Sequence, residues 1–111
     1  MAITGPAPPR HLRPATRKWF ATVVQEYELE PHHVRLLTLA GEAFDRCQQA
    51  REAIATHGTT YTDRFGSPKA RPEVAIERDS RIAFARLLRE LDLDVPPPDT
   101  RPPALRSNRR S

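Results

Sequence analysis

Apolar side chains recur at helical spacing in three separate segments of the chain. The first segment carries five of them along one face of a helix: Trp19, Phe20, Val23, Val24 and Tyr27. Proline is well tolerated in a first helical turn, whereas the residue before a proline disfavours helix. We therefore predict a helix that opens near Pro14 and stops around Glu28, ahead of Pro31.

The second segment predicts a much longer helix. It opens at Pro31, with the negative charge of Glu30 beside its N-terminus, and Gly58 supplies a C-terminal stop. Between residues 32 and 57, Gly41 is the only glycine and there is no proline. At 1.5 Å per residue, such a helix is roughly 40 Å long.

Six residues of this long helix fall at alternating steps of four and three, which is the spacing of an a/d seam in close helix packing. We call them the small-residue seam: Leu36, Ala40, Ala43, Cys47, Ala50 and Ile54. Because most of these side chains are small, whatever packs on the seam must approach closely. Two partners fit: the other helices of the same chain, or a neighbouring subunit. In the second case these six residues form an oligomer interface.

Between residues 59 and 71 the pattern changes from helical to β. Thr59 to Thr62 are β-branched or aromatic, and Asp63 to Gly66 supply turn chemistry. We predict a short hairpin at about 59–71, which needs support because two strands alone are barely stable. Pro72 then opens a third helix, which ends at Asp92–Asp94. Its expected buried face consists of Ile76, Ser80, Ala83, Phe84, Leu87, Leu88 and Leu91.

The predicted fold class is mainly α: a three-helix core with a long central helix and a small β-hairpin between helices two and three. Proline takes 12 of the 111 positions and clusters toward both ends. We expect a disordered N-terminal arm at 1–13, a helical oligomerisation and DNA-engaging core at 14–94, and a disordered basic tail at 95–111. Pro96–Pro98 should hold the tail extended and away from the core. A core of about 80 residues is marginal by itself, which favours oligomerisation.

Composition removes several functional classes. Cys47 is the only cysteine, so neither an intrachain disulfide nor a cysteine zinc cage can form. No run of about 18 apolar residues and no signal-like N-terminus occurs, so we expect an intracellular soluble protein without membrane contact. Gly-rich phosphate loops, a nucleophile elbow and paired histidine ligands are also missing. We therefore expect no enzyme activity, no metal and no cofactor, with Cys47 as a small core residue.

The net charge is +4, and the positive charge lies toward the flanks of the chain. Lysine and arginine bind phosphates through counterion release, without reading base sequence. These charges fit either contact with nucleic-acid phosphates or the solvated surface of a basic protein. In the first case, we predict that an N-terminal cluster contacts DNA first and that hairpin residues contact it second. These residues are Arg10, Arg13, Arg17 and Lys18, followed by Arg64, Lys69 and Arg71.

Four stretches follow one another over about residues 12–110: WFATVVQEYELEPHHVRLLTLAGEAFDR, GTTYTDRFGSPKARPEV, ERDSRIAFARLLRELDLD and RPPALRSNRR. In their order and spacing they resemble the small subunit of phage terminases, in the family named for phage twenty-seven. The third stretch closes on Leu-Asp-Leu, where the family more often has Leu-Gly-Leu.

The resemblance implies a function and partners. Such small subunits form ring-like homo-oligomers that engage the double-stranded phage genome and hand it to the large subunit, which holds the ATPase and the nuclease. They regulate that motor, have no catalytic site and act in the host cell cytoplasm. The alternative is a helical protein–protein adaptor without a DNA role.

The tail carries the expected docking residues for the large subunit. Leu105 would serve as an apolar anchor, and the arginines would attract an acidic partner, although DNA phosphates would satisfy the same charges. The docking residues are Arg101, Leu105, Arg106, Arg109 and Arg110.

Overall fold

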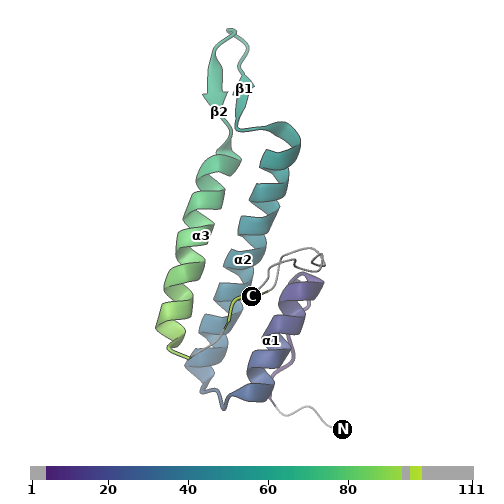
Figure 1. The fold of residues 1–111 in the computed structure, drawn as a ribbon, viewed down its shortest axis with the longest axis vertical. Coiled ribbons are helices and arrows are strands. Elements are labelled where there is room, and N and C mark those ends of the chain that lie inside the picture. The colour runs from purple at the N-terminus through teal and green to yellow at the C-terminus, as the bar shows by residue number, and fades with distance from the viewer. Residues whose placement is uncertain (1–4, 94–95, 99–111) are drawn as a thin grey trace, which may run out of the picture.

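The computed structural model describes residues 5–93 and 96–98, and within them three helices and one hairpin make up the regular structure (Figure 1). Helix α1 spans Pro14–Glu26, α2 spans Pro31–His57 and α3 spans Pro72–Leu91. Strands β1 (Thr60–Thr62) and β2 (Pro68–Ala70) form an antiparallel hairpin between α2 and α3. The predicted fold class is confirmed, and α1 ends two residues before the expected Glu28.

Each helix begins at the proline that the sequence marks as its start. Pro14, Pro31 and Pro72 occupy the first turn, and the residue before each of them is extended. Proline fits there because a first-turn N–H has no partner within the helix. At the start of α2, the backbone N–H of Glu30 also donates to Nδ1 of His33 at 3.0 Å.

The apolar core lies where α1 covers α2 and α3. Phe84 of α3 packs against Trp19 of α1 and Phe44 of α2, with ring centroids 6.2 and 5.1 Å apart. The predicted stripe of α1 is buried at four of its five positions, and Tyr27 packs at the edge. The buried core residues are Leu12, Trp19, Phe20, Val23, Val24, Leu37, Ala40 and Leu91.

Helix α1 is too short to cover the whole of α2. Its 13 residues match about half of the 27-residue α2, so over the other half α3 is the helix that packs against α2 (Figure 1). Cys47, Ala50 and Ser80 are buried along these two helices, as close packing by small side chains requires. The hairpin continues the same helix pair outward.

Half of the small-residue seam is covered by packing within the chain. Ala40, Cys47 and Ala50 are at most 5% exposed, so they are already covered by the chain's own helices. For these three residues, the packing partner is therefore the rest of the same chain and not a neighbouring subunit. Leu36, Ala43 and Ile54 stay partly exposed.

The N-terminal arm contributes to the core, which the sequence did not predict. Leu12 is 4% exposed and belongs to the core cluster. Gly41 of α2 makes room for it, because a Cβ atom at this position would lie 3.1 Å from Cδ1 of Leu12. The expected boundary after residue 13 therefore does not separate the arm from the packed helices.

The start of the tail also lies against the helices. The indole Nε1 of Trp19 donates to the carbonyl oxygen of Pro96 at 2.7 Å, and Pro98 is buried. The expectation that Pro96–Pro98 hold the chain away from the core is therefore wrong for these residues. The physical reason is that Trp19 offers both an apolar ring for proline and a donor for its carbonyl.

The Leu-Asp-Leu stop after α3 has a conformational explanation. Asp92 caps α3 with φ of 54° and ψ of 37°, the left-handed conformation that glycine most often supplies at a helix end. Aspartate tolerates this region better than most residues.

No helix in the described part of the chain is long and apolar enough to cross a membrane.

Candidate nucleic-acid interface

Arg13 does not present a free charge to solvent. Its guanidinium donates two hydrogen bonds to the Glu52 carboxylate, at 2.8 and 2.9 Å, and its backbone N–H donates to Oδ2 of Asp45 at 2.8 Å. The hydrogen bonds to Glu52 raise the pKa of Arg13 and hold the pKa of Glu52 below its ordinary value. Arg13 therefore fastens the arm to α2, a role that the sequence analysis did not assign.

The other three cations of the N-terminal cluster remain available. Arg10, Arg17 and Lys18 are exposed, and none of them takes part in an ion pair with another described residue. They lie on the arm and on the first turns of α1. Free cations on a rigid element are suited to phosphate contact because no intramolecular partner has to be displaced.

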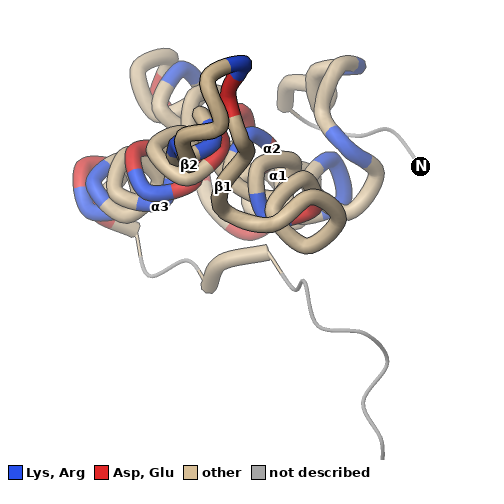
Figure 2. Tube along the Cα trace, turned by 90° about the horizontal axis from the view of Figure 1, so that it is seen from above, with Lys and Arg blue, Asp and Glu red and all other residues tan. Residues whose placement is uncertain are grey.

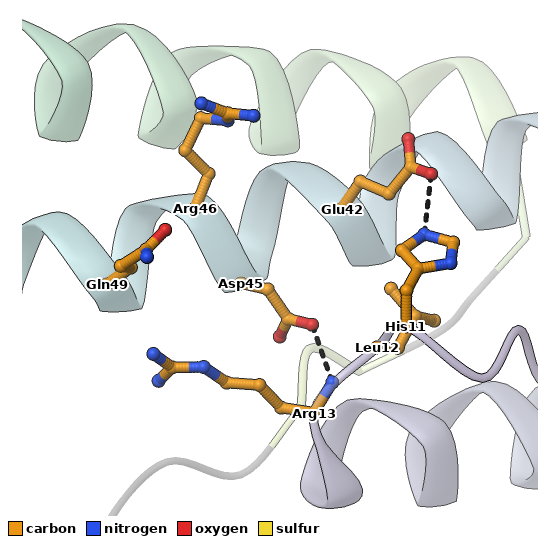
Figure 3. Close-up of a pocket in the computed structure, with 7 residues that line it drawn as sticks. All are labelled: His11, Leu12, Arg13, Glu42, Asp45, Arg46 and Gln49. Carbon is orange, nitrogen blue, oxygen red and sulfur yellow. Dashed lines mark hydrogen bonds and ion pairs between the residues drawn. The ribbon is translucent and has the colours of Figure 1, made fainter.

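A polar depression of about 530 Å³ lies between the arm and α2 (Figure 3). Its carboxylates are already engaged: Glu42 Oε2 lies 2.8 Å from Nε2 of His11, and Asp45 also accepts from the Thr16 hydroxyl at 2.5 Å. Among the described residues, no cluster of three or more His, Cys, Asp and Glu side chains is placed to hold a metal ion. The side chains that line the depression therefore connect the arm to α2 through hydrogen bonds.

Of the predicted hairpin cations, Lys69 lies on β2, Arg64 lies in the turn between the strands, and Arg71 follows β2 as the N-cap of α3. All residues of the two strands are exposed. Lys69 pairs with Tyr61 across the strands, and the Arg64 guanidinium lies 5.0 Å from the centroid of the Phe65 ring. Arg71 is partly buried at the foot of the hairpin, where its N–H donates to the Thr59 carbonyl at 2.9 Å. Arg64 and Lys69 are thus the more accessible two of the three.

The two basic groups do not merge into one patch. Figure 1 shows the start of α1 beside the middle of α2, whereas the hairpin projects past the ends of α2 and α3. On α3 itself, basic and acidic residues alternate (Figure 2), and Glu77 binds Arg51 at 3.1 Å and Arg81 at 3.2 Å. These two arginines hold the pKa of Glu77 below its ordinary value. The structure therefore has two separate cationic sites along its long axis.

Cys47 is a core residue, as predicted. Its side chain is 5% exposed, and Sγ lies 3.7 Å from Oε2 of Glu77. Burial raises the pKa of the Cys47 thiol above its ordinary value.

An apolar groove runs along one side of the α2–α3 pair, and the sequence did not single it out. One part, about 380 Å³, is lined by the apolar residues Leu39, Ala43, Ala83 and Leu87 and by the polar residues Glu42, Arg46, Asp79 and Ser80. Leu39 is 50% exposed there, and Ile76 further along is 36% exposed, so the expectation that Ile76 is buried is wrong. We call this surface the α2–α3 groove.

The expected docking residues of the tail, Arg101 to Arg110, lie outside the described residues.

The arrangement defines a small helical protein with a projecting basic hairpin and an open apolar groove. The family model of the phage terminase small subunit matches residues 16–96, which include nearly all of α1 and the whole of α2, the hairpin and α3. The chain belongs to this family, and the resemblance seen in its sequence is confirmed. No curated protein and no solved structure matches it.

Proposed function

We propose that this protein is a non-catalytic DNA-binding subunit of a phage packaging machine, acting in the host cell cytoplasm. It engages double-stranded phage DNA as a ring-forming homo-oligomer and recruits and regulates the large ATPase-nuclease subunit. The observation that carries the proposal is the family match over residues 16–96. The exposed cations and the α2–α3 groove agree with it, since they offer one surface for phosphates and another for protein.

The proposed DNA contacts come from both cationic sites. Arg10, Arg17 and Lys18 form the first site, and the hairpin residues Arg64 and Lys69 form the second, with Arg71 behind them. Arg13 is left out because Glu52 already neutralises it. In a ring each contact is repeated, so weak individual sites add through multivalency.

We expect the triple substitution of Arg10, Arg17 and Lys18 by glutamine to weaken DNA binding to all sequences alike. Each lost phosphate contact should reduce the slope of log K against log salt by about 0.9. A gel shift with salt titration on a mixed-sequence duplex measures both quantities. The matched control is Arg78→Gln, an exposed arginine on α3 that binds Asp79. Equal affinity and slope in the triple variant would remove the N-terminal site from the proposal.

The same titration distinguishes the proposed DNA-binding function from the main alternative. A helical adaptor without a DNA role would use the α2–α3 groove alone, and the wild-type chain would then show no salt-dependent binding to duplex DNA. That result would leave family membership intact and overturn the DNA-binding part of the proposed function.

The proposed oligomer contact is the α2–α3 groove together with the exposed remainder of the small-residue seam. Leu39 and Ile76 expose apolar surface on a chain whose core is small, and association would bury that surface. Ala43 lines the groove and belongs to the seam, which makes it the residue of choice for the test described in the Discussion.

The tail is the proposed docking arm for the large subunit. We expect Leu105→Ser to lower affinity for the large subunit in a pull-down while DNA binding stays unchanged, because phosphates need only the cations Arg101, Arg106, Arg109 and Arg110. Thr100→Ser is the matched control in the same segment. If Leu105→Ser leaves both the pull-down and DNA binding unchanged, the docking proposal fails, because an arm that binds only phosphates tolerates the loss of this side chain.

A further inference from the structure

Phe65 is the most exposed large apolar side chain among the described residues. It is 78% exposed and sits in the turn between β1 and β2. A phenyl ring at the tip of a projecting element would gain free energy if a partner covered it.

The turn that carries Phe65 is held in one conformation. Oδ1 of Asp63 accepts the backbone N–H of Phe65 at 2.8 Å and that of Ser67 at 2.9 Å. Gly66 adopts φ of 82°, which a residue with a side chain rarely tolerates. The ring is therefore presented by a pre-ordered turn, which reduces the entropy that binding would cost.

The surroundings of the ring are cationic. The guanidinium carbon of Arg64 lies 5.0 Å from the ring centroid, and Lys69 is exposed on the neighbouring strand. The only acid between residues 58 and 72 is Asp63, whose carboxylate already accepts the two backbone N–H groups. A partner that meets Phe65 thus meets positive charge around it.

We propose that Phe65 is an apolar wedge that inserts at a base step of duplex DNA while Arg64 and Lys69 contact the flanking phosphates. This inference rests on the DNA binding in the proposed function and names the residue that reaches the bases. Side chains such as phenylalanine partly unstack a base step when they enter a groove, and neighbouring cations position them on the backbone. The hairpin projects past the ends of α2 and α3, so the described helices do not cover its tip (Figure 1).

Charge favours DNA over a second protein as the partner of this tip. Between residues 58 and 72 the chain carries Arg64, Lys69 and Arg71 against the single acid Asp63, and lysine is depleted from the buried centres of protein interfaces. Phosphates would satisfy Arg64 and Lys69 without requiring them to be buried.

The test compares Phe65→Ala with Lys69→Gln in binding to a mixed-sequence duplex. Loss of the ring should reduce affinity about tenfold without changing the salt slope, because the phenyl group releases no counterions. Loss of Lys69 should reduce the slope by about 0.9. Ile82→Ala is the matched control, an apolar residue that is 40% exposed on α3 and should leave binding unchanged.

A second variant gives a direct signal of insertion. Phe65→Trp should bind the duplex with nearly wild-type affinity, and its added tryptophan fluorescence should be quenched on binding as the indole stacks on bases. The difference from the wild-type spectrum isolates this signal, because Trp19 is buried in the core.

Three results would overturn the inference. The first is wild-type affinity in Phe65→Ala together with an unquenched Phe65→Trp, while the wild-type chain binds DNA; the proposed function would then stand without the wedge. The second is a loss of oligomer mass in Phe65→Ala at unchanged monomer stability, which would assign the ring to a subunit contact. The third is absence of DNA binding by the wild-type chain, which would remove the proposed DNA role as well.

Discussion

Replacing Ala43 by glutamate is expected to convert the proposed homo-oligomer into monomers. Ala43 is only partly buried within the chain and lines the α2–α3 groove, so a second subunit seated there would cover it. A glutamate side chain in that contact is larger than the methyl group it replaces, and its carboxylate loses hydration even though Arg46 lines the same groove. These effects cost several kcal/mol, which is enough to reverse association at micromolar concentration. Light scattering coupled to size exclusion measures the mass.

The matched control for this change is Ala75→Glu. Ala75 is exposed on α3 and does not line the groove, so the same charge there should leave the oligomer mass unchanged. Circular dichroism of both variants should retain the helical signal, which separates dissociation from unfolding. A monomeric wild-type chain, or an Ala43→Glu variant of wild-type mass, would contradict the proposed contact.

Replacing Leu12 by alanine is expected to lower the free energy of unfolding by about 2–5 kcal/mol. Leu12 is 4% exposed and packs beside Gly41 and Thr16, so truncation leaves a cavity where arm and helices meet. Domains typically have only about 5–15 kcal/mol of stability in total, so the change is large. Denaturant unfolding at a fixed protein concentration measures it.

The control for Leu12→Ala is Ile82→Ala, which removes apolar atoms from a side chain that is 40% exposed. That change should shift the free energy of unfolding by no more than about 0.5 kcal/mol. Equal effects of the two substitutions would show that the arm is not part of the folded core.

Local signals along the chain were sufficient for the secondary structure. Pro14, Pro31 and Pro72 marked the three helix starts, because proline fits a first turn and excludes helix before it. The turn residues Asp63 and Gly66 located the hairpin for an equally local reason, since each acts on the backbone within a few residues. The order of these elements also carried the family resemblance.

The candidate site was less predictable, because it depends on which residues the fold leaves uncovered. Arg64 and Phe65 are neighbours in sequence, yet a turn with one arginine is normally solvated surface. The candidate site emerges only when the Phe65 side chain is known to be 78% exposed at a projecting tip. An apolar residue inside a predicted turn was the one signal that pointed to Phe65. The α2–α3 groove gave no such signal, because Leu39 fits an amphipathic stripe as well as any core residue.

By itself the sequence determined the helices, the hairpin, the basic character of the flanks and the family of this protein, since these follow from local spacing and from residue order. Only the tertiary structure decided that Arg13 is paired with Glu52, that Leu12 and Pro98 are packed, and that half of the small-residue seam is covered within the chain. These outcomes depend on segments about 30 to 80 residues apart in sequence. Whether a cation is free or a seam is covered is set by what folds against it, and periodicity within one helix carries no information about that partner.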